Sequence, residues 1–393
     1  MSYPLVFISV TIPVVLFVLI LIWLWRGLYR QPEVYGWTDL PHVCVVVAAR
    51  NEESHLPNLL TALRKQSYPA ELLKIVVVND NSTDGTAELV QGTVRWMPNL
   101  HLVSLSATQP GWGPKKWALQ RGIEATTAEI ILTTDADCTP ATEWVESVVN
   151  YFSDPRIGMV MGPAPLVRKD LSLVERSIHL DAVSLDALAA AGCGHGIALT
   201  CTGRNLAYRR VAFEEIGGFD NIAHYISGDD DLLMHKMSST DKWKIVFALT
   251  PRAVVPSPPP DGIKGFLRQR LRHASKGKAY YDLGARLFFR LLLPIIYIAN
   301  LASAFGMVTA LITLNPYWLI PTVIKLMGEA LVVYTYLGKV SDRVGPGIFL
   351  ITGALHHFYV VLIGLVGNFI SVEWKGRTYN GNHAAGESGN ITS

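Results

Sequence analysis

The stretch VCVVVAARNEE at residues 43–53 decides the fold, because a continuous apolar run passes directly into a polar and charged turn. A run of this kind is typical of a strand that is buried on both faces. Leu56, Leu59, Leu60 and Leu63 then follow at helical spacing. The sequence therefore predicts a strand and a helix in succession.

The same change from strand to turn returns twice along the chain. Residues 75–78 read IVVV and lead into NDNSTDGT at 79–86, while residues 129–134 read EIILTT and lead into DAD at 135–137. Buried strands that alternate with helices predict a parallel α/β sheet. Ligands bind outside the carboxyl ends of the strands in such sheets, which is where these polar clusters fall.

Two groups of carboxylates are candidate sites. Asp135 and Asp137 could share a divalent cation, or one could bind the metal and the other a ribose hydroxyl; their oxygens suit Mg²⁺ or Mn²⁺ that bridges a diphosphate. A solvated turn is the simpler alternative for this pair. The later run SGDDDLL at 227–233 opens a predicted amphipathic helix. One or two of its aspartates could cap that helix, which leaves at least one for general base catalysis.

The composition divides the chain into a soluble middle between two membrane regions. Half of the 393 residues are hydrophobic and 17% are charged, but residues 1–25 hold no charged side chain and residues 291–393 hold five basic and four acidic ones. This argues against a disordered chain, a collagen or a small disulfide scaffold. A net charge of +2 argues against nucleic acid as a partner. The four cysteines are scattered, so we expect reduced core thiols in a cytosolic domain.

Four segments are expected to cross a membrane. Residues 1–25 lack the basic start and the small-residue end of a secretory signal, so we interpret them as a retained anchor. Arg26 and Arg30 follow the anchor, which places the soluble domain in the cytoplasm. We therefore expect a multi-pass protein of the cell (inner) membrane. The C-terminal region, residues 291–370, should contain three helices, at 291–314, 317–337 and 348–370.

Residues 261–286 form a basic amphipathic segment in which apolar side chains recur every four positions. This pattern predicts an interfacial helix. Attraction to anionic lipid headgroups explains its basic face, and a second interpretation lets Arg270 and Arg272 reach a diphosphate leaving group. Within the third membrane segment, Lys325 and Glu329 lie four residues apart, and we expect a structural ion pair rather than a transport role.

Five motifs in order carry a family resemblance. They are NEE at 51–53, NDNSTDGT at 79–86, DAD at 135–137, GDDDL at 228–232 and QRLRH at 269–273. Together they resemble membrane-bound glycosyltransferases of family 2, which include ceramide glucosyltransferase, bacterial lipid and carotenoid glycosyltransferases and, more distantly, cellulose and hyaluronan synthases. The resemblance implies a GT-A (Rossmann-like) α/β domain over residues 40–260, a nucleotide-sugar donor that is usually a UDP-sugar, a divalent metal and inversion at the anomeric carbon.

The resemblance also implies roles for single residues. Asp229 is expected to be the catalytic base, and Asp137 is expected to bind the metal together with Asp135. The nucleotide-sugar is expected to contact Ala48, Arg50, Glu52, Asp80, Asp135 and Lys115, although Lys115 could equally be an exposed lysine at the start of a helix. The acceptor and the diphosphate are expected to contact Arg204, Asn205, Asp230, Gln269, Arg270 and Arg272.

Departures from the family pattern limit which reactions of the family we expect. Asn79 and Gly228 replace acidic residues of the family, and Asp230 could partly substitute for the second. His273 replaces a Trp that lies beside the acceptor sugar in the processive synthases, and without a stacking indole polymer synthesis is less favoured. We therefore expect transfer of a single sugar to a lipid or other membrane-embedded acceptor. A processive polysaccharide synthase and a non-catalytic membrane scaffold are the alternatives.

The tail, residues 371–393, contains EWKGRTY at 373–379, which resembles a segment after the spans of lipid-directed members. A part in catalysis would require this segment in the cytoplasm, whereas four crossings place it outside. Either one C-terminal segment is re-entrant or the tail has no catalytic part. Residues 380–393 are rich in Gly, Asn and Ser, and we expect them to be disordered.

Overall fold

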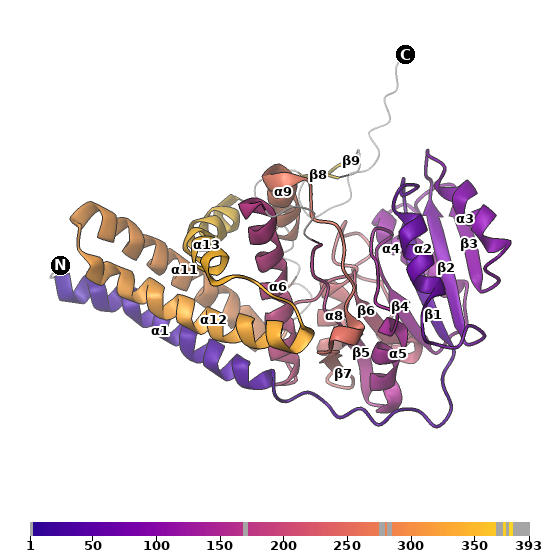
Figure 1. Ribbon diagram of the computed structural model, residues 1–393, viewed down its shortest axis with the longest axis horizontal. Coiled ribbons are helices and arrows are strands. Elements are labelled where there is room, and N and C mark those ends of the chain that lie inside the picture. Colours follow the sequence, from indigo (N-terminus) through magenta and orange to yellow (C-terminus); the bar gives the residue numbers. More distant parts are fainter. Residues whose placement is uncertain are drawn as a thin grey trace, which may run out of the picture.

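A mixed sheet with its helices forms one half of the molecule, and a bundle of long helices forms the other (Figure 1). The computed structural model describes residues 3–167, 172–274, 280, 285–366, 372–374 and 377–379. Helices α6 (Leu173–Cys193) and α9 (Gly262–Ala274) lie between the two halves. They connect the sheet to the bundle.

Seven strands form the sheet, in the order β3-β2-β1-β4-β6-β5-β7. The neighbouring pairs among β1 to β4 are all parallel, which confirms the expected parallel α/β arrangement for this half. β6 pairs antiparallel with both β4 and β5, so the sheet is mixed and a parallel sheet throughout is wrong. The strands are β1 (Val43–Ala49), β2 (Leu73–Asp80), β3 (Leu100–Leu105), β4 (Ile130–Thr133), β5 (Ile157–Met161), β6 (Leu206–Arg209) and β7 (Lys244–Phe247).

The reversed direction of β6 follows from the path of the chain through α6. The chain leaves β5 at the carboxyl edge of the sheet, and α6 returns it to that same edge. There Leu206, the first residue of β6, pairs with Thr133 and Met161, which end β4 and β5. The loop that precedes β6, residues 202–205, therefore enters the carboxyl edge.

Short helices cover the sheet. α2 buries Leu56, Leu59, Leu60 and Leu63, the four leucines whose spacing predicts it. α8 begins within the acidic run, as expected. The helices of this half are α2 (Leu56–Arg64), α3 (Thr86–Val94), α4 (Pro114–Glu124), α5 (Trp144–Val149), α7 (Arg210–Glu215) and α8 (Asp231–Ser238), with single 3₁₀ turns η1 (Asn150–Ser153) and η2 (Pro251–Ala253).

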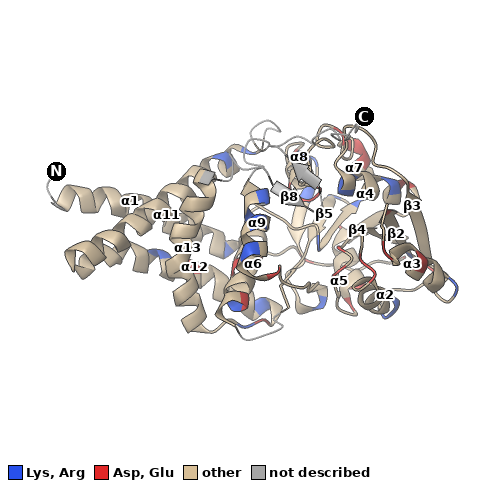
Figure 2. Ribbon diagram, turned by 90° about the horizontal axis from the view of Figure 1, so that it is seen from above, with Lys and Arg blue, Asp and Glu red and all other residues tan. Residues whose placement is uncertain are grey.

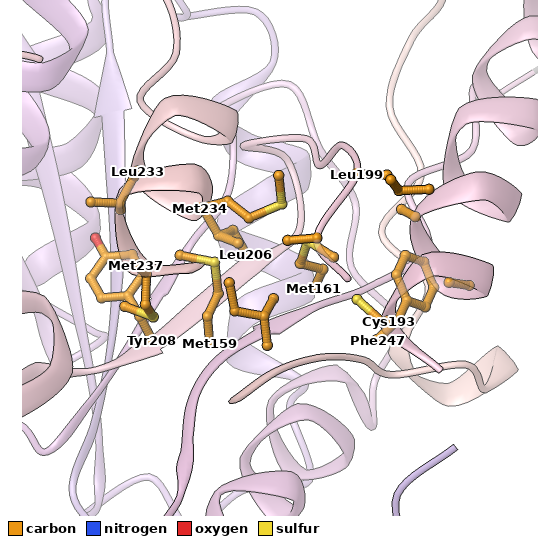
Figure 3. Close-up of a cluster of buried hydrophobic side chains, with 14 of the residues drawn as sticks. Met159, Met161, Cys193, Leu199, Leu206, Tyr208, Leu233, Met234, Met237 and Phe247 are labelled. Atoms are coloured by element: carbon orange, nitrogen blue, oxygen red, sulfur yellow. The ribbon is translucent and has the colours of Figure 1, made fainter. Parts of the chain in front are cut away.

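The two faces of the sheet bury separate hydrophobic cores. Val45 and Val47 of β1 face the core that contains α2 and α5, whereas Val46 faces the core that contains α6 and α8. Figure 3 shows part of the second core, which contains side chains of β5, β6 and α8 as well as Phe247 of β7 and Cys193 of α6. The same core reaches Leu24 of α1 (Tyr3–Gly27). The sheet and the bundle are therefore joined through one core. All four cysteines are free thiols.

Four helices of the described chain are long and apolar enough to cross a membrane. Their bounds agree with the expected segments to within a few residues, and few charged residues mark this bundle in Figure 2. Lys325 is buried at the bundle interior with its Nζ 2.5 Å from Glu329 Oε1, which is the expected ion pair. The helices are α1, α11 (Leu287–Thr313), α12 (Ile320–Val340), which follows the 3₁₀ turn η3 (Pro316–Leu319), and α13 (Pro346–Val366).

α13 lies across the other three long helices, which run side by side along the long axis of the molecule (Figure 1). The hydroxyl of its Thr352 is 2.8 Å from that of Ser177 in α6, and Tyr359 stacks on Phe266 of α9 with ring centroids 5.5 Å apart. The two short strands β8 (Val372–Trp374) and β9 (Arg377–Tyr379) pair antiparallel beside α9. α13 and the strands after it thus contact helices on the sheet side of the bundle.

Candidate active site

A cavity of about 420 Å³ opens at the carboxyl edge of the sheet. The ends of β1, β2 and β4, the loop before β6 and the acidic run before α8 form one part of its wall, and α6 and α9 form the other. The sequence-predicted residues that line it are Ala48, Arg50, Glu52, Asp80, Lys115, Asp135, Asp137, Arg204, Asp229, Asp230, Gln269, Arg270 and Arg272. Five motifs that are far apart in the sequence thus meet in one place.

Lys115 joins two of these motifs. It lies in the first turn of α4, and its Nζ is 2.7 Å from Asp135 Oδ1 and 2.9 Å from Asp229 Oδ2. Its side chain is only 23% exposed, so the alternative of an exposed lysine is wrong. Burial alone would lower the pKa of Lys115, but the carboxylates of Asp135 and Asp229 raise it above its usual range. The lysine is therefore a fixed positive charge between them.

Asp137 is the candidate cation ligand of the cavity. Burial, followed by the nearby carboxylates of Asp135 and Glu52, raises its pKa above the usual range. A divalent cation would relieve this repulsion, so the donor set fits Mg²⁺ or Mn²⁺. Among the residues that the structure describes, no third His, Cys, Asp or Glu completes a metal site here. The remaining ligands would have to come from water or a bound phosphate.

The loop before β6 and the acidic run fit closely against each other. The backbone N–H of Gly203 donates to Asp230 Oδ2 (2.9 Å). Asp230 also caps α8, because its Oδ1 accepts from the N–H of Asp231. A Cβ atom at Gly203 would lie 3.1 Å from Asp229 Oδ2 and 3.3 Å from Lys115 Nζ. Asp230 therefore holds the loop and the helix in place, while Asp229 points at Lys115.

The turns after β1 and β2 lock together. Asn51 has a φ of 56°, and its Oδ1 accepts from the N–H of Thr83 (2.8 Å). Asp80 is buried at the end of β2, and its Oδ2 lies 3.9 Å from a guanidinium nitrogen of Arg50. This pairing fixes Asp80 and Arg50 at the wall of the cavity, where the sequence predicts the nucleotide.

Arg204 and Asn205, which are adjacent in the sequence, have different surroundings. Arg204 lines the cavity and donates to Ser257 Oγ (2.6 Å). Asn205 is buried away from it: Nδ2 donates to the carbonyls of Pro163 and Ala253, and Oδ1 accepts from the indole of Trp144. The described contacts of Asn205 thus hold the sheet edge together, and the structure does not place it with the other site residues.

α9 contributes its basic face to the cavity. Gln269, Arg270 and Arg272 all line it. Arg270 forms an ion pair with Asp181 of α6 and lies over the ring of Phe266. Its charge is thus shared with a carboxylate, which sequence reasoning did not foresee. The side chain of His273 lies outside the described part of the structure.

Three further residues lie at or near the site, and two of them, Tyr280 and Asp186, were missed because no motif marks them. Lys116 is fully buried, and its Nζ donates to the carbonyls of Tyr225 and Ser227, which fixes the segment before Asp229. Tyr280 donates to Asp231 Oδ2 (2.5 Å). Asp186 lines the cavity from the wall that α6 forms. Each of these contacts joins segments that are far apart in the sequence.

The proteins that this chain resembles in sequence are glycosyltransferases. The profile of the family "Glycosyl transferase family 2" matches residues 44–217. Probable glycosyltransferase YdaM of Bacillus subtilis is 30% identical over 247 residues, which cover 62% of this chain and 57% of that protein. Beta-monoglucosyldiacylglycerol synthase of a Nostoc species is 29% identical over 230 residues, which cover 56% of this chain and 45% of that protein. The chain spans about half the length of these curated relatives.

Among solved structures, a mannosyltransferase of Pyrobaculum calidifontis, PcManGT in complex with GDP-Man and Mn²⁺, superposes with a TM-score of 0.58. The two are 21% identical, and the match covers 92% of this chain and 97% of that chain. At this identity the likeness concerns the fold, which is the GT-A fold that the motifs imply.

Proposed function

This chain carries a family 2 glycosyltransferase domain of the GT-A fold, and we propose that it transfers one sugar from a nucleotide-sugar to a membrane-embedded lipid, with inversion at the anomeric carbon. A UDP-sugar is the expected donor. The observation that carries the proposal is the meeting of Asp135, Lys115 and Asp229 in a cavity whose other wall, α6, packs on the membrane bundle. The relative named as a glucosyldiacylglycerol synthase supports a lipid acceptor.

The mechanism follows from the charges in the cavity. Asp135 and Asp137 would hold a divalent metal, which supplies positive charge where negative charge builds on the diphosphate. Arg272 of α9 adds positive charge at the same cavity. Asp229 accepts the proton of the acceptor hydroxyl while that oxygen bonds to the anomeric carbon. The bond to the diphosphate breaks on the opposite face of the sugar, which inverts the configuration.

The test is release of nucleoside diphosphate by the full chain in nanodiscs made from its host's lipids, with a panel of nucleotide-sugars and Mn²⁺ or Mg²⁺. Asp229→Asn should lower turnover by about 100-fold or more, because a positioned general base contributes roughly that much. Asp39→Asn, the same change at an exposed position, is the matched control. Full turnover of Asp229→Asn would rule out the assigned base, and long polymer products would favour the processive alternative.

The topology that we propose has three crossings, by α1, α11 and α12, with α13 in the plane of the membrane. Basic residues at the sheet end of these three helices, Arg26, Arg286 and Lys339 among them, support a cytoplasmic catalytic domain in the inner membrane. Leu350, Leu355 and Leu362 of α13 are exposed on an apolar face that would enter the headgroup boundary. The contacts of α13 with α6 and α9 support this placement.

In this topology the segment after α13 lies on the same side of the membrane as the catalytic domain. The tail is then cytoplasmic, as a part in catalysis requires, whereas four crossings would place it outside. A reporter fused after residue 393 tests it. Green fluorescent protein at that position should fluoresce, and alkaline phosphatase should be inactive in intact cells. Active alkaline phosphatase would show that α13 crosses the membrane.

A further inference from the structure

The cavity has an apolar part that the proposed mechanism does not use. Ile178, Ala182 and Leu185 of α6 line it, together with Met161 of β5 and Phe247 of β7. These side chains offer a surface for the apolar portion of an acceptor. The one carboxyl group among the described lining residues of α6 is Asp186.

Asp186 is held in a defined position. It is only 7% exposed, and its Oδ2 accepts from the N–H of Ala164 (2.8 Å) and lies 3.5 Å from the hydroxyl of Tyr336 in α12. In the described part of the chain, Oδ1 receives no hydrogen bond, although the residue lines the cavity. This oxygen is not buried but open to the cavity, so only water or a bound ligand can donate to it there. This oxygen is therefore a place where a ligand can donate a hydrogen bond.

Most of the basic groups that line the cavity have acidic neighbours. Lys115 lies between Asp135 and Asp229, and Arg270 pairs with Asp181. Arg204 interacts electrostatically with both Asp137 and Asp186. In all, eight carboxyl and five basic side chains of the described residues line the cavity. A divalent metal and the diphosphate of a donor would offset each other's charge, so a second phosphate in this cavity would still meet the excess of carboxyl groups among the described lining residues.

We propose that the acceptor is an uncharged lipid alcohol whose head group donates a hydrogen bond to Asp186, and that a lipid phosphate is not an acceptor. This inference rests on the proposed function. It agrees with a base at Asp229, because an alcohol must lose its proton as it attacks, whereas a phosphate oxygen is already ionised. The alcohol oxygen bonds to the anomeric carbon, its proton passes to Asp229, and the diphosphate leaves with the electron pair of the broken bond.

With a neutral sugar as the transferred group, the charge of the product reports the acceptor class, whichever host lipid receives the sugar. The full chain in vesicles of its host's lipids is supplied with donor labelled in the sugar, and the labelled lipid extract is passed over an anion-exchange resin. A neutral lipid alcohol gives a labelled product that does not bind the resin. A labelled product that binds the resin and elutes with salt would overturn the proposal while leaving the transferase function intact. No label in the lipid would overturn both.

The role of Asp186 is tested separately by kinetics. Asp186→Asn should raise the apparent KM for the lipid about 10-fold or more, the size expected when a hydrogen bond to a charged group is lost, with the KM for the donor changed by less than about 2-fold. Ser184→Ala, on the same helix but outside the cavity lining, is the control, because its hydroxyl donates to the carbonyl of Leu180 within the helix. A lipid KM equal to that of the control would overturn the assignment of Asp186.

Discussion

At the scale of single residues, Lys115 determines the charge balance of the cavity. Its ammonium group lies within 3 Å of carboxylate oxygens of both Asp135 and Asp229, which the proposed mechanism uses for different purposes. The first would bind the metal and the second would accept a proton. One lysine therefore couples the donor side of the cavity to the acceptor side.

Lys115→Gln should tighten the binding of Mn²⁺ and slow turnover. Lys115 competes with a divalent cation for Asp135, and its removal leaves both carboxylates without this counter-charge. We expect a several-fold lower Kd for Mn²⁺ and a kcat at least about 10-fold lower, in line with about 1.5–3 kcal/mol for a charged hydrogen bond. Electron paramagnetic resonance of free Mn²⁺ measures the first effect. Lys242→Gln, at an exposed lysine paired with Glu215, is the control and should change neither the Kd for Mn²⁺ nor kcat. Weaker Mn²⁺ binding by Lys115→Gln would contradict the competition between Lys115 and the cation.

Asp186 should make stability depend on pH. Burial raises its pKa from 3.8 to about 6. A carboxyl whose pKa is higher in the folded state contributes stability at low pH and loses it as the pH rises through the folded value. Asp186→Asn should therefore melt above the wild type near pH 7.5, by the equivalent of at most about 3 kcal/mol, and this difference should shrink toward pH 4.5. Melting curves in detergent measure it, and a difference that does not vary with pH would contradict the assignment.

At the scale of elements, the loop before β6 packs closely against two charged side chains of the cavity. Gly203→Ala would place a Cβ atom about 3 Å from Asp229 and Lys115, so it should move one of them. We expect turnover to fall about 10-fold or more while the melting temperature changes little, because a small displacement in a catalytic constellation is costly. In contrast, Gly92→Ala lies in open space on the exposed side of α3, and it should add roughly 0.5–1 kcal/mol of stability with unchanged turnover. Equal activity of the two variants would contradict the close fit at Gly203.

The elements also show what the sequence could predict. The polar clusters after β1, β2 and β4 are brought together because parallel neighbouring strands end at one edge, which periodicity alone indicates. β3 was not foreseen because it is an edge strand in which only Leu100 is fully buried, so it lacks a continuous apolar run. The direction of β6 depends on where α6 returns the chain.

Side-chain partners were less predictable than strands. The pair of Arg270 and Asp181 joins residues 89 positions apart, and Asp186 meets Tyr336 across 150 positions. No local pattern encodes such contacts, since each depends on how α6 packs. The same limit explains Asn205, which belongs to the right segment of the chain but faces the core beside Trp144.

At the scale of the whole molecule, α6 makes the catalytic half and the membrane half one folding unit. Its apolar residues lie in the same core as Val46 of the sheet, Leu21 and Leu24 of α1 and Leu28, which follows α1. α6 thus packs on the sheet and on α1 at the same time. The placement of the cavity wall that carries Asp186 accordingly depends on the bundle.

A fragment of residues 31–286, without α1, α11, α12 and α13, should therefore fail to fold as a soluble monomer. Removing the bundle exposes the face of α6 that packs on α1 and α12, and an apolar face of this length promotes aggregation. We expect the fragment to sediment on ultracentrifugation, whereas the full chain in detergent stays monodisperse. Adding detergent to the fragment should recover solubility without a cooperative melting transition, because detergent covers the apolar face but does not fix α6 against the sheet. A monodisperse fragment that melts cooperatively in buffer and binds a nucleotide-sugar would show that the sheet alone positions the site.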